Sequence, residues 1–114
     1  MSDPVTTETT TDVDPMVALL AAVKTYLQIT WTDEETDNRL KELIRAGIYY
    51  INGKVMDDED YSVASYPRTL LFEYVRYARD GALDVFENNY RALILALQHE
   101  RMVDLYVQSA QGTV

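Results

Sequence analysis

Apolar residues between Pro67 and Leu105 recur at a helical spacing, and this pattern constrains the fold more than any other feature of the chain. Their steps of three, four and one place them on one side of an α-helix, whereas residues of a strand would alternate. They are Leu71, Tyr74, Val75, Ala78, Ala82, Val85 and Phe86. Pro67 suits a first turn, and Asn88-Asn89 marks the expected break before a second run over residues 90–105. The sequence therefore predicts a helical hairpin or one long bent rod.

The second run, residues 90–105, is more apolar than is usual for a helix that has one side in solvent. Residues 93–97 read Leu-Ile-Leu-Ala-Leu and point in nearly every direction around the helix axis. The run is far too short to cross a bilayer, so we expect protein to surround it. Either the other helices of this domain or a neighbouring subunit would do so.

A first helix is predicted over residues 15–27, because Asp14 can cap it and Pro15 suits its first turn. After it we expect a short extended linker with Ile29 and Trp31 in the core.

The next helix is predicted to begin with a capping box formed by Thr32 and Glu35, and to end at Asn52 with Gly53 in a left-handed conformation. Gly47 lies within it, which suggests that another backbone passes close by. Its expected buried face consists of Leu40, Leu43, Ile44, Gly47, Ile48 and Ile51.

Together these patterns predict an all-α fold: a small bundle of about four helices with a long central helical hairpin and flexible termini. The chain of 114 residues is long enough for one such domain, placed over residues 15–105. Residues 1–14 are rich in Thr and acid and are expected to be a disordered arm. Residues 106–114 are expected to be a flexible tail.

The net charge of −9 is concentrated in residues 1–15 and 54–66. Such a surface disfavours tight binding to duplex DNA, which depends on clustered Lys and Arg. The acidic run of the second segment does not fit an EF-hand, because Ser62 and Arg68 stand where Gly and Glu are required. We expect a solvated acidic loop there, made of Asp57, Asp58, Glu59 and Asp60.

The residue types that catalysis needs are sparse. The chain has no cysteine, His99 is its single histidine, and its four glycines form no phosphate-binding loop. The sequence therefore predicts no enzyme, no catalytic or metal site and no cofactor. Neither a signal peptide nor a membrane span is expected, which suggests synthesis in the cytosol.

Tyrosine is abundant, with nine residues in a small domain. Tyrosine is favoured both at the margins of cores and at protein interfaces, and Arg is its frequent companion at interfaces. Most of the tyrosines can cap the domain's own core, but some are expected at a subunit contact. The predicted contact consists of Tyr49, Tyr50, Arg76, Tyr77, Arg79 and Tyr90.

Five stretches of the chain form a recognisable series: residues 23–29 (VKTYLQI), 40–46 (LKELIRA), 50–54 (YINGK), 74–79 (YVRYAR) and 86–90 (FENNY). In their order and spacing they resemble the small head-tail connector (adaptor, head-completion) proteins of tailed bacteriophages. The resemblance covers roughly residues 16–100, while the acidic N-terminal arm departs from the usual pattern.

The resemblance implies a structural subunit, made in the bacterial host cytoplasm, that forms a ring beneath the phage portal protein, usually of twelve copies. Such a ring lies at the head-tail junction of the virion, extends the DNA channel without specific nucleic-acid binding, and contacts the next neck or tail-completion protein. Residues 57–60 are placed near the lumen or rim. The segment that reaches the portal in this family corresponds to Met102, Leu105, Tyr106 and Val107.

A different function class is also compatible with the sequence. A small acidic helical regulatory protein, or one whose acidic loop mimics nucleic acid, would share the same composition. Purified portal protein separates the two classes, because a connector is expected to assemble when portal is added, whereas a regulator of this kind is expected to remain a monomer or dimer.

Overall fold

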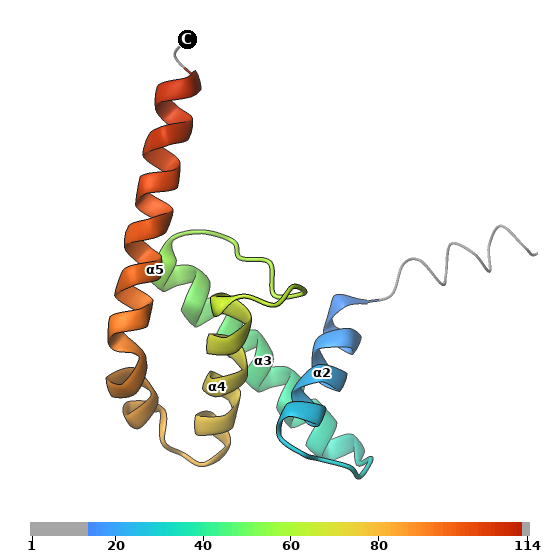
Figure 1. Ribbon diagram of the computed structural model, residues 1–114. Helices are drawn as coiled ribbons and strands as arrows, with labels where there is room; N and C mark the ends of the chain where they lie inside the picture. The colour runs from blue at the N-terminus through green and yellow to red at the C-terminus, as the bar shows by residue number, and fades with distance from the viewer. Residues whose placement is uncertain (1–13, 113–114) are drawn as a thin grey trace, which may run out of the picture.

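The computed structural model describes residues 14–112, and this part of the chain folds into four α-helices with no strand (Figure 1). With the labels of the figure, they are α2 (Pro15–Tyr26), α3 (Glu34–Val55), α4 (Tyr66–Arg79) and α5 (Leu83–Gly112). The predicted all-α fold of about four helices is therefore confirmed. The predicted disordered arm falls on residues that lie, apart from Asp14, outside the described range.

Helix α3 is the element on which the others pack. It contacts α2, α4 and α5, whereas α2 and α5 lie on opposite sides of the domain (Figure 1). Helices α4 and α5 form a hairpin, and the C-terminal part of α5 extends beyond the rest of the domain. This leaves one long helix whose first half is part of the bundle and whose second half projects from it.

The core is built from all four helices. Its fully buried side chains are Val23 of α2, Leu40, Ile44, Ile51 and Val55 of α3, Leu70, Leu71 and Val75 of α4, and Phe86 of α5. The predicted face of α3 is thus largely confirmed, with Leu43 and Ile48 half-buried at its edge. Of the predicted stripe, Val85 is exposed, because the turn before α5 changes the helical phase.

The turn between α4 and α5 lies at residues 80–82, so the predicted break at Asn88-Asn89 is wrong. Gly81 has a φ of 66°, a left-handed conformation that is inexpensive for glycine. The amide groups of residues 81 and 82 donate to the carbonyls of Ala78 and Tyr77, which satisfies the end of α4. The two asparagines lie on the exposed surface of α5, where a polar side chain does not interrupt a helix.

The start of α3 differs from the predicted capping box by one residue. Asp33 caps the helix, and its carboxylate accepts from the Thr36 amide at 3.0 Å and from the Thr36 hydroxyl at 2.7 Å. Aspartate caps a helix as well as threonine does, and here it makes both bonds with one side chain. Thr32 precedes the cap.

The end of α3 also differs from the prediction, because the helix continues through Gly53 to Val55. Met56 takes the left-handed position instead, with a φ of 57°. Val55 is buried, so the extra turn adds to the core. Asn52 holds the following loop: its side-chain oxygen accepts from the Glu59 amide at 3.2 Å and from the Tyr61 hydroxyl at 2.7 Å.

Only one of the two linker residues predicted to enter the core does so. Ile29 is buried, but Trp31 is 52% exposed. Gln28 has a φ of 61°, and the chain bends again at Trp31, so the linker is not extended and the two side chains do not share a side.

Residues 93–97 are not surrounded by the described part of the chain, contrary to the first of the two predicted arrangements. Ile94 and Leu97 are buried against the domain, whereas Leu95 is 55% exposed. Helix α5 also runs to Gly112, so the expected loss of regular structure after Leu105 is not seen over residues 106–112.

Gly47 and Gly53 provide a matched pair of substitutions within α3. A Cβ added at Gly47 would lie 2.7 Å from the Leu71 side chain and 2.9 Å from that of Tyr74, so the close neighbour is side chain rather than the predicted backbone. A Cβ at Gly53 would meet nothing within 4 Å. We expect Gly47→Ala to lower the melting temperature and Gly53→Ala to raise stability by up to about 1 kcal/mol, measured by thermal and urea denaturation.

Leu97 and Leu95 test which side of α5 belongs to the core. Leu97 is 3% exposed, so Leu97→Ala should cost about 2–5 kcal/mol of unfolding free energy. Leu95→Ala in the monomer should cost a small fraction of that, because the side chain already faces solvent. Equal losses for the two variants in urea denaturation would contradict this assignment.

Candidate docking surface

The projecting end of α5 exposes large apolar side chains in a continuous region. They are Met102, Val103, Leu105, Tyr106 and Val107, all substantially exposed. Figure 1 shows this end of the helix clear of α3 and of the loop that follows it. Scattered exposed apolar residues are ordinary, but a contiguous group on a protruding helix is typical of an interaction site. It contains all four residues predicted to contact the portal.

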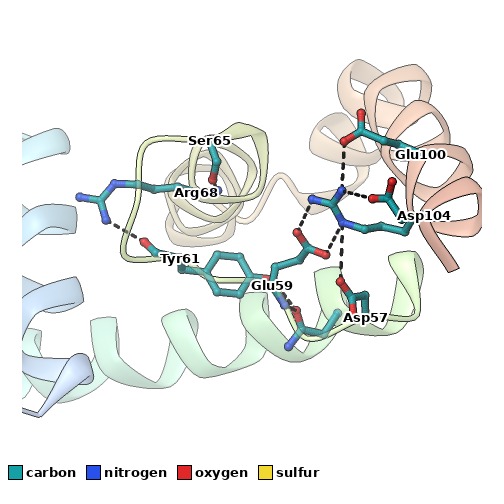
Figure 2. Close-up of polar contacts among 9 residues, drawn as sticks. Asp57, Glu59, Tyr61, Ser65, Arg68, Glu100 and Asp104 are labelled. Carbon is teal, nitrogen blue, oxygen red and sulfur yellow. Dashed lines mark hydrogen bonds and ion pairs between the residues drawn. The ribbon is translucent and has the colours of Figure 1, made fainter. Parts of the chain in front are cut away.

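An ion-pair cluster fixes the base of this projection. Arg101 donates from Nε to Oε2 of Glu59 and from Nη2 to Oε1, both at 2.8 Å, while Asp57 lies 3.6 Å away (Figure 2). The same guanidinium also contacts Glu100 at 3.0 Å and Asp104 at 3.3 Å. A bidentate pair of this kind restricts both partners, so it joins α5 to the loop at the level where the helix leaves the domain.

The cluster changes the expectation of a solvated acidic loop. The Glu59 side chain is 4% exposed and bound to Arg101, so only part of the loop is free in solvent. The hydrogen bonds from Arg101 hold the pKa of Glu59 below its ordinary value, against the effect of burial. The hydrogen bond with Glu59 raises the pKa of Asp57. Asp58 and Asp60 remain exposed.

The loop between α3 and α4 is also held by contacts with α4. Tyr61 is buried, and its carbonyl accepts from Nη1 of Arg68 at 2.7 Å (Figure 2). The Arg68 guanidinium also lies 4.7 Å from the centroid of the Phe72 ring. Asn52 and Arg101 make the other contacts that hold the loop. Together these contacts fix the position of Glu59 next to α5.

A second polar cluster lies inside the bundle around Glu73, which is 5% exposed. Its carboxylate accepts from the Tyr90 hydroxyl of α5 at 2.9 Å, from the Tyr26 hydroxyl of α2, and from Arg76 at 3.4 Å. Burial opposes ionisation, but the hydrogen bonds from the two tyrosines and the charge of Arg76 outweigh it and hold the pKa of Glu73 below its ordinary value. Burial and the bond to Glu73 raise the pKa of Tyr90 to about 12.

The predicted subunit-contact residues divide into two groups. Tyr50, Tyr77 and Tyr90 pack around Phe86 of the same chain, with ring centroids 6.2, 6.1 and 5.1 Å away, so each has a role in this domain's own core. Tyr49 is 85% exposed on the opposite side of α3.

The two arginines of that set, Arg76 and Arg79, are exposed at the end of α4. Arg76 is also bound to Glu73, and Arg79 lies beside Arg39 in a shallow groove. The structure therefore does not bring the predicted contact residues onto one face, and the contact stays a prediction.

Sequence reasoning missed both polar clusters. Glu73 left a signal, because it is the one charged residue in the apolar run of residues 70–75. The sequence contains no signal for the pair of Arg101 and Glu59. The two residues are 42 positions apart, and either charge alone is typical of a solvent-facing residue.

Within the described residues, no group of three or more His, Cys, Asp and Glu side chains is placed to hold a metal ion. His99 lies exposed on α5. Over the same residues, no helix combines the length and the apolar character that a membrane span requires.

Comparison with protein-family models, with curated proteins and with solved structures finds no match to this chain.

The Glu73 cluster makes a prediction about acid stability. Because the pKa of Glu73 is lower in the folded chain than its ordinary value of 4.5, the cluster's contribution is complete above that pH and is lost as pH falls through the lower folded value. We expect Glu73→Gln to cost about 1–3 kcal/mol at pH 7 and to flatten the decline in stability below pH 4.5. Urea denaturation across pH measures both.

Glu42→Gln is the matched control, because Glu42 is exposed on α3 and makes no contact with this cluster. A Glu73→Gln variant with the stability and acid profile of the control would contradict the assigned role.

Proposed function

We propose that this chain is a structural, non-enzymatic subunit that joins parts of a larger assembly, and that the assembly is the head-tail junction of a tailed bacteriophage. The projecting apolar end of α5 is the observation that carries the proposal. A helix that leaves its own domain and exposes Met102, Leu105 and Tyr106 has an element suited to insertion into a partner. In this proposal the partner is the phage portal protein.

The architecture of α5 supports this assignment. Its first half is held in the core by Phe86, Ile94 and Leu97, and Arg101 fixes the point where the helix leaves the domain. The direction of the projection is thus set before any partner binds. A preformed element loses less conformational freedom on docking than a disordered tail would.

The proposed assembly is a homo-oligomeric ring beneath the portal that extends the DNA channel and contacts the next neck or tail-completion protein. Exposed Tyr49 on α3 and Arg79 at the end of α4 are available for contacts between copies. Asp58 and Asp60 are exposed and acidic, a character suited to the rim or lumen of a channel that DNA must pass without binding.

The alternative is a small acidic helical regulatory protein or nucleic-acid mimic, and its mimic form is less well supported. A mimic would need its carboxylates free and regularly displayed, yet Asp57 and Glu59 pair with Arg101 within the same domain. The apolar end of α5 also has no role in a mimic.

Truncation after Arg101 tests the proposal. We expect the remaining chain to keep its helical circular dichroism and its cooperative melt, since the removed side chains of residues 102–110 are exposed. We expect its binding to the portal protein encoded in the same genome to be lost, as measured by co-sedimentation of the two purified proteins. Unchanged portal binding by the truncated chain, or a full-length chain that neither binds portal nor forms rings with it, would overturn the proposal.

A further inference from the structure

The outer side of α5 carries a second apolar stripe that starts well before the projecting end. Its members are Ala92, Leu95, Ala96, His99, Met102, Val103, Tyr106 and Val107, and all of them are exposed. The helical repeat places this stripe opposite Tyr90, Ile94 and Leu97, which face the domain. In Figure 1 the other helices pack on one side of α5 only. Helix α5 therefore has one apolar side within the domain and another without a partner among the described residues.

The size of the stripe matches what a helix-helix contact needs. From Ala92 to Val107 it spans roughly 22 Å of helix at 1.5 Å per residue. Its large side chains, Leu95, Met102, Val103, Tyr106 and Val107, are 45–76% exposed and offer on the order of several hundred Å², which approaches the roughly 800 Å² that each partner contributes to a stable interface. The stripe contains no carboxylate, although the chain carries a net charge of −9.

The order of side-chain sizes along the stripe favours one partner and one direction. Small residues, Ala92 and Ala96, lie at its N-terminal end, and large ones, Met102 and Tyr106, lie at its C-terminal end. A second copy running antiparallel, centred on His99, sets Ala92 against Tyr106 and Ala96 against Met102. Parallel copies would instead leave a gap between alanines and crowd the two tyrosines. Interfaces pack best where large side chains oppose small ones.

A groove beside the stripe adds to this fit. It lies between α3 and α5 and has a volume of about 340 Å³. Ile94 and Leu95 line it together with the polar and charged side chains of Tyr50, Lys54, Glu87, Arg91 and Gln98. In the antiparallel arrangement, Met102 of the second copy comes to the level of this groove. Glu100 and Asp104, the acidic residues nearest to the stripe, are ion-paired with Arg101.

We propose that the outer stripe of α5 is a self-association surface on which α5 of a second copy packs antiparallel, with His99 at the two-fold axis. This inference concerns the free protein and does not depend on the proposed function. If both hold, the dimer covers the apolar end of α5 until the portal displaces the second copy.

Analytical ultracentrifugation of the full chain tests the surface. We expect a species of twice the 13.1 kDa chain mass that dissociates on dilution. Met102→Glu should weaken the dimer at least about tenfold, because it places a charge in the contact. Gln108→Glu introduces the same charge on another side of the same projecting segment and should leave the dimer intact. A full chain that stays monomeric at several hundred micromolar, or a dimer that Met102→Glu does not weaken, would overturn the proposal.

Cross-linking tests the direction, since the chain has no cysteine of its own. Under mild oxidation, His99→Cys alone should form disulfide-linked dimers, and Ala96→Cys mixed with Met102→Cys should form them faster than either variant by itself. Faster cross-linking of Met102→Cys alone than of the mixture would indicate a parallel pair and overturn the antiparallel arrangement. Portal binding is not measured in either experiment, so their outcome is separate from that of the truncation.

Discussion

The buried carboxylate of Glu73 is the interaction on which the arrangement of the bundle depends. A charge in the core is tolerable only when it is hydrogen bonded, and here the donors come from three helices: Tyr26 of α2, Arg76 of α4 and Tyr90 of α5. Helices α2 and α5 do not pack against each other, and both pack on α3 and α4. The hydrogen bonds to Glu73 therefore link two helices that do not pack against each other.

Helix α5 has one part that is buried in the domain and one part that projects from it. Phe86, Ile94 and Leu97 give the helix its place in the core, and Arg101 binds the loop at the last turn that touches the domain. Beyond that turn the helix continues with the exposed apolar side chains of Met102, Val103, Leu105, Tyr106 and Val107, which no other described helix covers. Exposing such apolar surface to water is unfavourable. The proposed docking and the proposed self-association would each cover it with a partner.

Tyrosine illustrates how one residue type serves both purposes. The rings of Tyr50, Tyr77 and Tyr90 pack around Phe86. Their hydroxyl groups reach polar partners, which are exposed Glu87 and Asn89 for the first two and buried Glu73 for Tyr90. Tyr49 and Tyr106 place the same side chain in solvent. Composition alone did not separate these groups, because the aromatic ring and the hydroxyl suit both environments.

The sequence by itself determined the helices, because their signals are local. Apolar spacing, the Asp14 cap and the first-turn prolines act within a few residues, and the structure confirms the helices that they predict. Helix ends were predicted less well, since Gly53 and Asn88 are each compatible with continuing a helix whose core contacts favour it. Only the tertiary structure decided which side of α5 is covered, which tyrosines are internal, and that Glu59 meets Arg101. Those outcomes depend on residues far apart in the chain, whose proximity no local pattern encodes.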